Sequence, residues 1–175
     1  RDMEVVPMGS AFPSPGLFPF DALARSGARS MRRLPAAQIT GALTAGDETL
    51  REVLQQRQQR MGIRLRSDEL VITNGAMEAL NLCLQAVTRP GDVVVVESPT
   101  FYAALQAIER LHLRALEVRT DPAEGVDLEA LETLLKRERV AACWFMTSFR
   151  KPSGAPMPPK RVYAVGQLLA RVGFT

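Results

Sequence analysis

The sequence predicts a three-layer α/β/α fold built on a mainly parallel sheet. Three apolar runs, at 70–73, 93–96 and 140–147, lack the alternation of a half-exposed strand, and such runs are typical of strands buried on both faces. Helix-like segments of about a dozen residues separate them, which is the connection that parallel strands require. A chain of 175 residues is long enough for one domain with a substantial core.

Two segments precede the alternating region. Residues 1–19 are rich in Pro, Gly and Ser, so we expect an extended arm or linker there. Residues 20–66 are predicted to form a helical segment, with one helix at 20–34 and a second at 48–61. The third predicted part, residues 67–175, holds the sheet.

The first predicted helix carries acid at its start and base at its end. Asp21 lies in its first turn, and Arg29, Arg32 and Arg33 lie near its end, an order that suits the helix dipole. The net charge of the whole chain is only +3. We therefore interpret these arginines as a solvated face and not as a nucleic-acid patch.

The remaining elements follow from periodicity and turn residues. Met77, Leu80, Leu84 and Val87 recur at helical spacing. The elements predicted between and after the apolar runs are helices at 76–87 and 100–111, a strand at 113–118, a helix that begins after Asp127, and a helix at 158–172.

Three loops are candidate ligand sites, because ligands of α/β sheets bind beyond the carboxyl ends of the strands. These loops are 73–77, 97–102 and 147–154. The first would join a strand to a helix N-terminus, where small residues let backbone N–H groups approach an anion. It matches neither a P-loop nor a dinucleotide fingerprint, so two interpretations stay open: a phosphate site or a tight turn.

The second loop contains two aromatic residues, Phe101 and Tyr102, next to a predicted strand end. An aromatic ring at such a place can stack on a flat cofactor. Taken alone, an aromatic residue at such a place more often belongs to the core, so both interpretations stay open here.

Composition excludes several classes of protein. Apolar residues make up 46% and charged residues 23%, as in ordinary soluble domains. The single histidine, His112, lies between two leucines, so we expect a structural role for it and no metal site. The apolar runs are too short to span a membrane and no signal peptide opens the chain, so we expect a cytoplasmic protein. Cys83 and Cys143 lie in apolar runs and are predicted to pack as small hydrophobic residues.

Three motifs taken together resemble the fold-type I pyridoxal-phosphate enzymes. They are Thr73-Asn74-Gly75-Ala76-Met77-Glu78-Ala79-Leu80, Arg89-Pro90-Gly91-Asp92 and Glu97-Ser98-Pro99-Thr100-Phe101-Tyr102. The chain looks most like the aminotransferase-like (class I/II) domain of MocR-type regulators in the GntR superfamily, and residues 9–19 resemble the linker of those regulators. The resemblance covers nearly the whole chain and implies the front part of a fold-type I large domain.

The resemblance also implies a cofactor and the residues that hold it. The cofactor would be pyridoxal phosphate, with its phosphate held by Gly75, Ala76 and Met77. Phe101 would stack on the pyridine ring, with Tyr102 as the alternative. The cofactor supplies an electron sink, and the protein of such an enzyme supplies a lysine and an acid partner for the ring nitrogen.

The sequence departs from this family in two ways. Lys151-Pro152-Ser153-Gly154 stands where the family has Asn-Pro-x-Gly, so a charged donor replaces the asparagine that binds the 3′-oxygen of the cofactor. The ammonium of Lys151 either takes over this contact or turns to solvent. The family's Schiff-base lysine, ring-nitrogen aspartate and substrate-binding arginine come later than Thr175. We therefore predict no catalytic residue, weak phosphate-anchored cofactor binding at most, and no transamination by this chain alone.

The function implied by the resemblance is effector sensing in a transcription regulator. The effector would be a small amino acid or amine, the full-length protein would be a homodimer, and DNA would be bound only through a separate domain absent from this chain. The chain would then be a piece of a longer protein. A fragment of a free-standing amino-acid aminotransferase is the alternative. A small basic nucleic-acid-binding domain is more remote, because the arginines are dispersed and no such motif is present.

Overall fold

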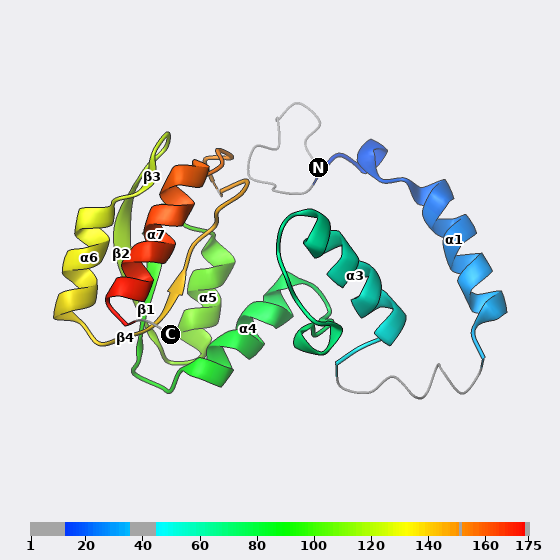
Figure 1. Cartoon of the computed structure of the whole chain (residues 1–175), viewed down its shortest axis with the longest axis horizontal. Coiled ribbons are helices and arrows are strands. Elements are labelled where there is room, and N and C mark those ends of the chain that lie inside the picture. The colour runs from blue at the N-terminus through cyan, green and yellow to red at the C-terminus, as the bar shows by residue number, and fades with distance from the viewer. Residues whose placement is uncertain (1–12, 36–44, 151, 174–175) are drawn as a thin grey trace, which may run out of the picture. The chain divides into compact units, whose positions relative to one another are not determined.

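Residues 13–35, 45–150 and 152–173 are described by the computed structural model, in which the chain divides into two units, Arg1–Ile72 and Thr73–Thr175. The first unit is helical, and the second contains the whole sheet. Figure 1 shows the elements of both units along the chain.

Within residues 13–35 and 45–72, the first unit contains two α-helices and two short 3-10 helices. Its elements are η1 (Pro15–Leu17), α1 (Phe20–Arg33), α3 (Glu48–Arg60) and η2 (Ser67–Glu69). The helices predicted at 20–34 and 48–61 are thus confirmed, while residues 1–12 of the predicted arm lie outside the described residues. A side-chain cap explains where α3 begins, because the carboxylate of Asp47 accepts a hydrogen bond from the Leu50 amide at 2.8 Å.

The strand predicted at 70–73 is wrong. The Ile72 amide donates to the carbonyl of Ala45 at 3.0 Å, and this segment belongs to no strand. The run lies in the first unit up to Ile72, whereas all four strands belong to the second. The apolar residues of this run are compatible with a strand. A strand forms, however, only where an adjacent strand pairs with its backbone N–H and C=O groups. The loop at 73–77 is therefore not a strand-to-helix turn, although a helix does begin at Ala76.

The second unit alternates helices and strands. Its elements are α4 (Ala76–Val87), β1 (Val93–Ser98), α5 (Tyr102–Arg110), β2 (Arg114–Asp121), β3 (Gly125–Val126), α6 (Leu128–Arg137), β4 (Val140–Trp144) and α7 (Pro159–Arg171). The strands predicted at 93–96 and 113–118 are confirmed. The strand predicted at 140–147 is shorter than expected, because β4 ends at Trp144.

The sheet has the order β3-β2-β1-β4 and is mainly parallel, as predicted. Strand β1 is central: its Val95 is opposite Leu116 of β2 and Cys143 of β4, both in parallel register. The short strand β3 runs antiparallel to β2, with Val126 opposite Thr120.

Helices cover both faces of this sheet, which confirms the three-layer fold. Val94 and Val96 pack against α4 and α5 on one face, while Val95 packs with residues of α6 and α7 on the other, and all three valines are fully buried. Figure 1 shows α4 and α5 on one side of the strands and α6 and α7 on the other. Full burial of a side chain of this size contributes about 1.5–3 kcal/mol, so β1 is the main apolar anchor of the unit.

The two cysteines differ in their surroundings. Cys143 packs against the cluster beneath α6 and α7, as predicted. The prediction is wrong for Cys83, which is exposed. Because Leu80 and Leu84 define the buried stripe of α4, a residue one position before Leu84 lies about 100° away around the helix and faces outward.

Candidate functional site

A cavity of about 340 Å³ lies beyond the carboxyl ends of the central strands. The first two turns of α4 and the segment that follows β4 form most of its wall, and Phe101 from the loop after β1 completes it. Its lining residues are Ala76, Met77, Leu80, Phe101, Trp144, Phe145, Met146, Thr147 and Ser148. Three segments distant in sequence therefore meet at one place, as expected for the carboxyl edge of a parallel sheet.

The α4 side of this cavity is the N-terminal end of a helix. Gly75 is the N-cap of α4 and has φ +92°, a conformation that favours glycine. The first hydrogen bond of the helix is donated by the Ala79 amide to the Gly75 carbonyl, at 3.3 Å. The amides of Ala76 and Met77 come before that bond and so have no partner within the helix. Gly75 itself is not among the lining residues. This helix start can attract an anion through its N–H groups and its dipole.

Glu78 modifies the charge at this helix start. Its carboxylate accepts a hydrogen bond from the Asn74 amide, while the Thr73 hydroxyl donates to the Gly75 carbonyl at 3.1 Å. The carboxylate fixes the loop before α4, and it places a negative charge in the first turn. An anion at Ala76 and Met77 must therefore be held mainly by the backbone groups.

The two aromatic residues after β1 face different surroundings. Their ring centroids are 5.0 Å apart with an interplanar angle of 59°. Phe101, the N-cap of α5, lines the cavity, whereas Tyr102 is 65% exposed and is not among the lining residues. Of the two residues considered for a stacking role, Phe101 is thus the one that the structure brings to Ala76 and Met77.

The third loop contains the remaining predicted residue. Lys151 lies outside the described residues. The loop that carries it leaves β4 through residues 145–148, which line the cavity. Its base is closed by a hydrogen bond from the Met157 amide to the Thr147 carbonyl at 2.9 Å.

Sequence reasoning missed two buried charged residues next to this cavity. Glu97 at the end of β1 and Arg150 in the loop after β4 are each only 3% exposed. Burial raises the pKa of the Glu97 carboxyl above its usual value, while the Met146 amide and Arg150 act in the opposite direction. The signal for Glu97 was available, since a lone acid follows four buried valines. Arg150 carried no comparable signal, because nothing local predicts its burial.

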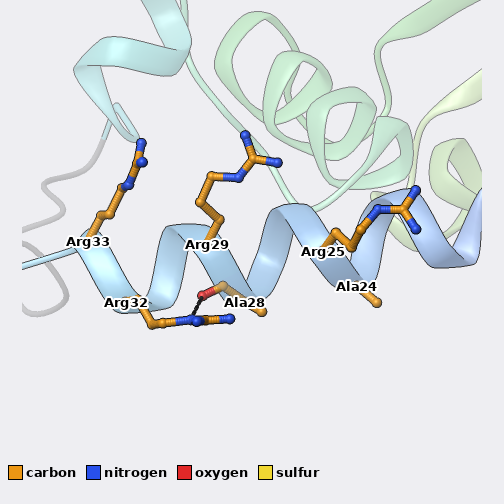
Figure 2. A pocket seen from close by; sticks show the side chains of 6 residues that line it. All are labelled: Ala24, Arg25, Ala28, Arg29, Arg32 and Arg33. Carbon is orange, nitrogen blue, oxygen red and sulfur yellow. Dashed lines mark hydrogen bonds between the residues drawn. The ribbon is translucent and has the colours of Figure 1, made fainter.

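Another hollow, of about 720 Å³, runs along α1 in the first unit. Figure 2 shows Arg25, Arg29 and Arg33 projecting from one side of the helix, while the Nε of Arg32 donates to the Ala28 carbonyl at 3.2 Å. One helix supplies every lining residue, so the hollow is a surface groove. The exposure of these arginines agrees with the predicted solvated face.

The described parts of the chain contain neither a membrane-spanning helix nor a cluster of metal-binding side chains. None of the helices there is both long enough and apolar enough to cross a membrane. Within the same residues, no three His, Cys, Asp or Glu side chains gather where they could hold a metal ion.

Comparison with known proteins gives relatives of two kinds. The chain is 48% identical over 175 residues to the uncharacterized HTH-type transcriptional regulator YdcR of Escherichia coli K12, and 31% identical over 173 residues to the regulator YjiR of the same organism. These matches cover 100% and 97% of this chain, but only 37% and 36% of the two relatives. The chain thus spans little more than a third of the length of the regulators it resembles.

Solved aminotransferase structures also resemble the chain. The crystal structure of LysN, an alpha-aminoadipate aminotransferase of Thermus thermophilus complexed with N-(5′-phosphopyridoxyl)-L-leucine, matches with a TM-score of 0.83 and 31% identity, covering 95% of this chain and 41% of LysN. The family model for aminotransferase class I and II matches residues 25–174. The chain therefore belongs to the class I and II aminotransferase family and forms part of an aminotransferase-like domain.

Proposed function

We propose that this chain binds pyridoxal phosphate in the cavity between α4, Phe101 and the end of β4. The observation that carries the proposal is the meeting of an anion-attracting helix start, at Ala76 and Met77, with an aromatic wall at Phe101 in one cavity. A volume of about 340 Å³ lies in the range of about 300–1,000 Å³ that is typical of ligand pockets. The phosphopyridoxyl ligand of LysN supports the same ligand class.

Each residue would have a separate task. Gly75, Ala76 and Met77 hold the phosphate through backbone N–H groups, and Phe101 packs against the ring. Tyr102, whose ring centroid lies 5.0 Å from that of Phe101, is the weaker candidate for stacking. Lys151 contacts the 3′-oxygen of the cofactor or turns to solvent. When bound, pyridoxal phosphate supplies an electron sink, and the residues named here orient it.

The two lysines that the structure describes are engaged away from the cavity. Lys136 on α6 lies 2.8 Å from the Glu132 carboxylate, and Lys160 on α7 lies 3.7 Å from that of Glu124. Neither lines the cavity. This supports the expectation that the 175-residue chain by itself releases no keto acid from amino acids, since that reaction needs a lysine at the cofactor.

The longer protein would be a cytoplasmic regulator that senses an amino acid or amine through this domain. The similarity of this chain to YdcR along all its 175 residues, at 48% identity, supports that interpretation. In such a regulator, a separate domain binds DNA, and two copies of the protein form a homodimer.

The 31% identity to LysN supports the second candidate, part of an amino-acid aminotransferase. The enzyme would be favoured if the full-length protein released keto acids from amino acids and if these amino acids did not change its binding to DNA.

The single tryptophan of the chain allows a direct test, because Trp144 lines the cavity. Pyridoxamine 5′-phosphate has an amine in place of the aldehyde, so it does not condense with lysines, and it absorbs where tryptophan emits. We expect it to quench Trp144 saturably and inorganic phosphate to compete. Ala76→Glu should weaken binding at least tenfold by placing a carboxylate at the phosphate position. Gln85→Glu adds the same charge on the exposed part of α4 and should change binding less than twofold. Equal affinity in the two variants, or no saturable quenching, would contradict the proposal.

A further inference from the structure

Glu97 and Arg150 form a buried charged pair beside the cavity without lining it. The Nη1 of Arg150 lies 3.9 Å from the Oε2 of Glu97, and each side chain is only 4% exposed. Apart from these two, every residue that is buried in the described ranges is apolar. A charged pair is retained in such surroundings only where further hydrogen bonds satisfy both partners.

Arg150 binds the backbone of two separate segments. Its Nε donates to the Ala155 carbonyl at 3.0 Å, its Nη1 donates to the Asp121 carbonyl at 3.2 Å, and its Nη2 donates to the Pro122 carbonyl. Ala155 belongs to the loop after β4, while Asp121 is the last residue of β2 and Pro122 begins the turn to β3. The planar guanidinium thereby fastens that loop to the carboxyl end of β2 through three different nitrogens, which the single nitrogen of a lysine cannot reproduce.

Glu97 extends the same connection to the cavity wall. Its Oε1 accepts a hydrogen bond from the Met146 amide at 2.5 Å, across 49 residues of sequence. Met146 and the two residues after it line the cavity. The carboxylate therefore ties this part of the wall to the end of β1, directly before the loop that carries Phe101.

We propose that Glu97 and Arg150 are positioning residues for the ligand of this cavity. They set the separation between the wall at 146–148 and the ring position at Phe101, and they do not touch the helix start that would hold the phosphate. This inference rests on the proposed function. According to it, the pair contributes to the affinity for the pyridine ring of the ligand and does not contribute to the affinity for its phosphate.

The test compares two ligands and three variants of the full 175-residue chain. Arg150→Lys keeps the charge but cannot reach three carbonyls at once, and Glu97→Gln keeps an oxygen for the Met146 amide but removes the charge. Arg161→Lys is the matched control, because Arg161 pairs with Glu124 at 3.3 Å on the surface and lies outside the cavity. Trp144 quenching gives the affinity for pyridoxamine 5′-phosphate, and displacement gives that for inorganic phosphate.

We expect Arg150→Lys to weaken pyridoxamine 5′-phosphate binding at least tenfold and inorganic phosphate binding less than threefold. Glu97→Gln should weaken pyridoxamine 5′-phosphate binding about threefold, and Arg161→Lys should leave both affinities unchanged. Equal losses for both ligands would indicate a general structural role and overturn the inference, as would unchanged affinities in both variants. If Arg150→Lys does not fold, Glu97→Gln carries the comparison alone.

Hydrogen exchange separates this inference from the proposed function. The Met146 amide should exchange slowly in the wild-type chain and in Glu97→Gln, and at least tenfold faster in Glu97→Ala, whether or not a ligand binds. If the wild-type chain binds no pyridoxamine 5′-phosphate, the proposed function fails and the ligand-positioning role fails with it. Binding by the wild-type chain with unchanged variants overturns the positioning role alone.

Discussion

Gly125 lies so close to Met157 that a Cβ atom built on residue 125 would be 2.8 Å from the Met157 Cγ. Gly125 belongs to β3 and also has φ +89°, where side chains other than glycine are strained. Met157 is buried in the cluster beneath α6 and α7. The close approach therefore joins the edge of the sheet to the loop that follows β4.

Gly125→Ala should destabilise the second unit through both effects. The left-handed backbone costs about 1–2 kcal/mol for a non-glycine residue, and overpacking adds about 1–3 kcal/mol. Gly91→Ala is the control, because Gly91 has φ +91° and open space around its Cβ position. Urea unfolding followed by Trp144 fluorescence should show a lower free energy of unfolding for both variants, with the larger loss for Gly125→Ala. A similar loss in the two variants would mean that Met157 moves aside freely.

The two thiols should differ in reactivity. Burial raises the pKa of the Cys143 thiol to about 12, while Cys83 is exposed on α4. Because the thiolate is the reactive form, one thiol of the native chain should react quickly with a disulfide reagent at about pH 8 and the other at least tenfold more slowly. Cys83→Ser should remove the fast phase, and urea should expose the second thiol. Two equally fast thiols in the native chain would show that β4 opens readily.

Stability should carry a pH-dependent contribution from Glu97. Burial raises its pKa above the usual value of 4.5 in the folded chain, so the folded state binds this proton more tightly than the unfolded state. The contribution of the group is then fully present below about pH 4.5, the unfolded pKa, and is lost as the pH rises through the folded pKa. The difference in unfolding free energy between the wild-type chain and Glu97→Gln should therefore fall as the pH rises from 4.5, and then level off. A difference that grows with pH would mean that the pairing with Arg150 outweighs desolvation.

Local sequence determined most of the helices and the central strands. Four consecutive valines have only one stable environment, a strand covered on both faces, and β1 occupies it with fully buried side chains. Asp127 begins α6 as expected, because its carboxylate accepts hydrogen bonds from the amides of Glu129 and Ala130 at 3.0 Å. Such effects act over a few residues, so they can be read from the chain directly.

Only the tertiary structure decided which apolar run becomes a strand and which charges are buried. The run at 70–73 is as apolar as β4, but it pairs with no strand. Local periodicity cannot predict which distant segments pair with each other. Glu97 and Arg150 are separated by more than fifty residues, and the energy of each depends on the other, on Met146 and on three carbonyls. The sequence by itself thus determined the elements and the motifs of the site, whereas the fold alone determined how the site is held together, because burial and pairing arise only when distant segments meet.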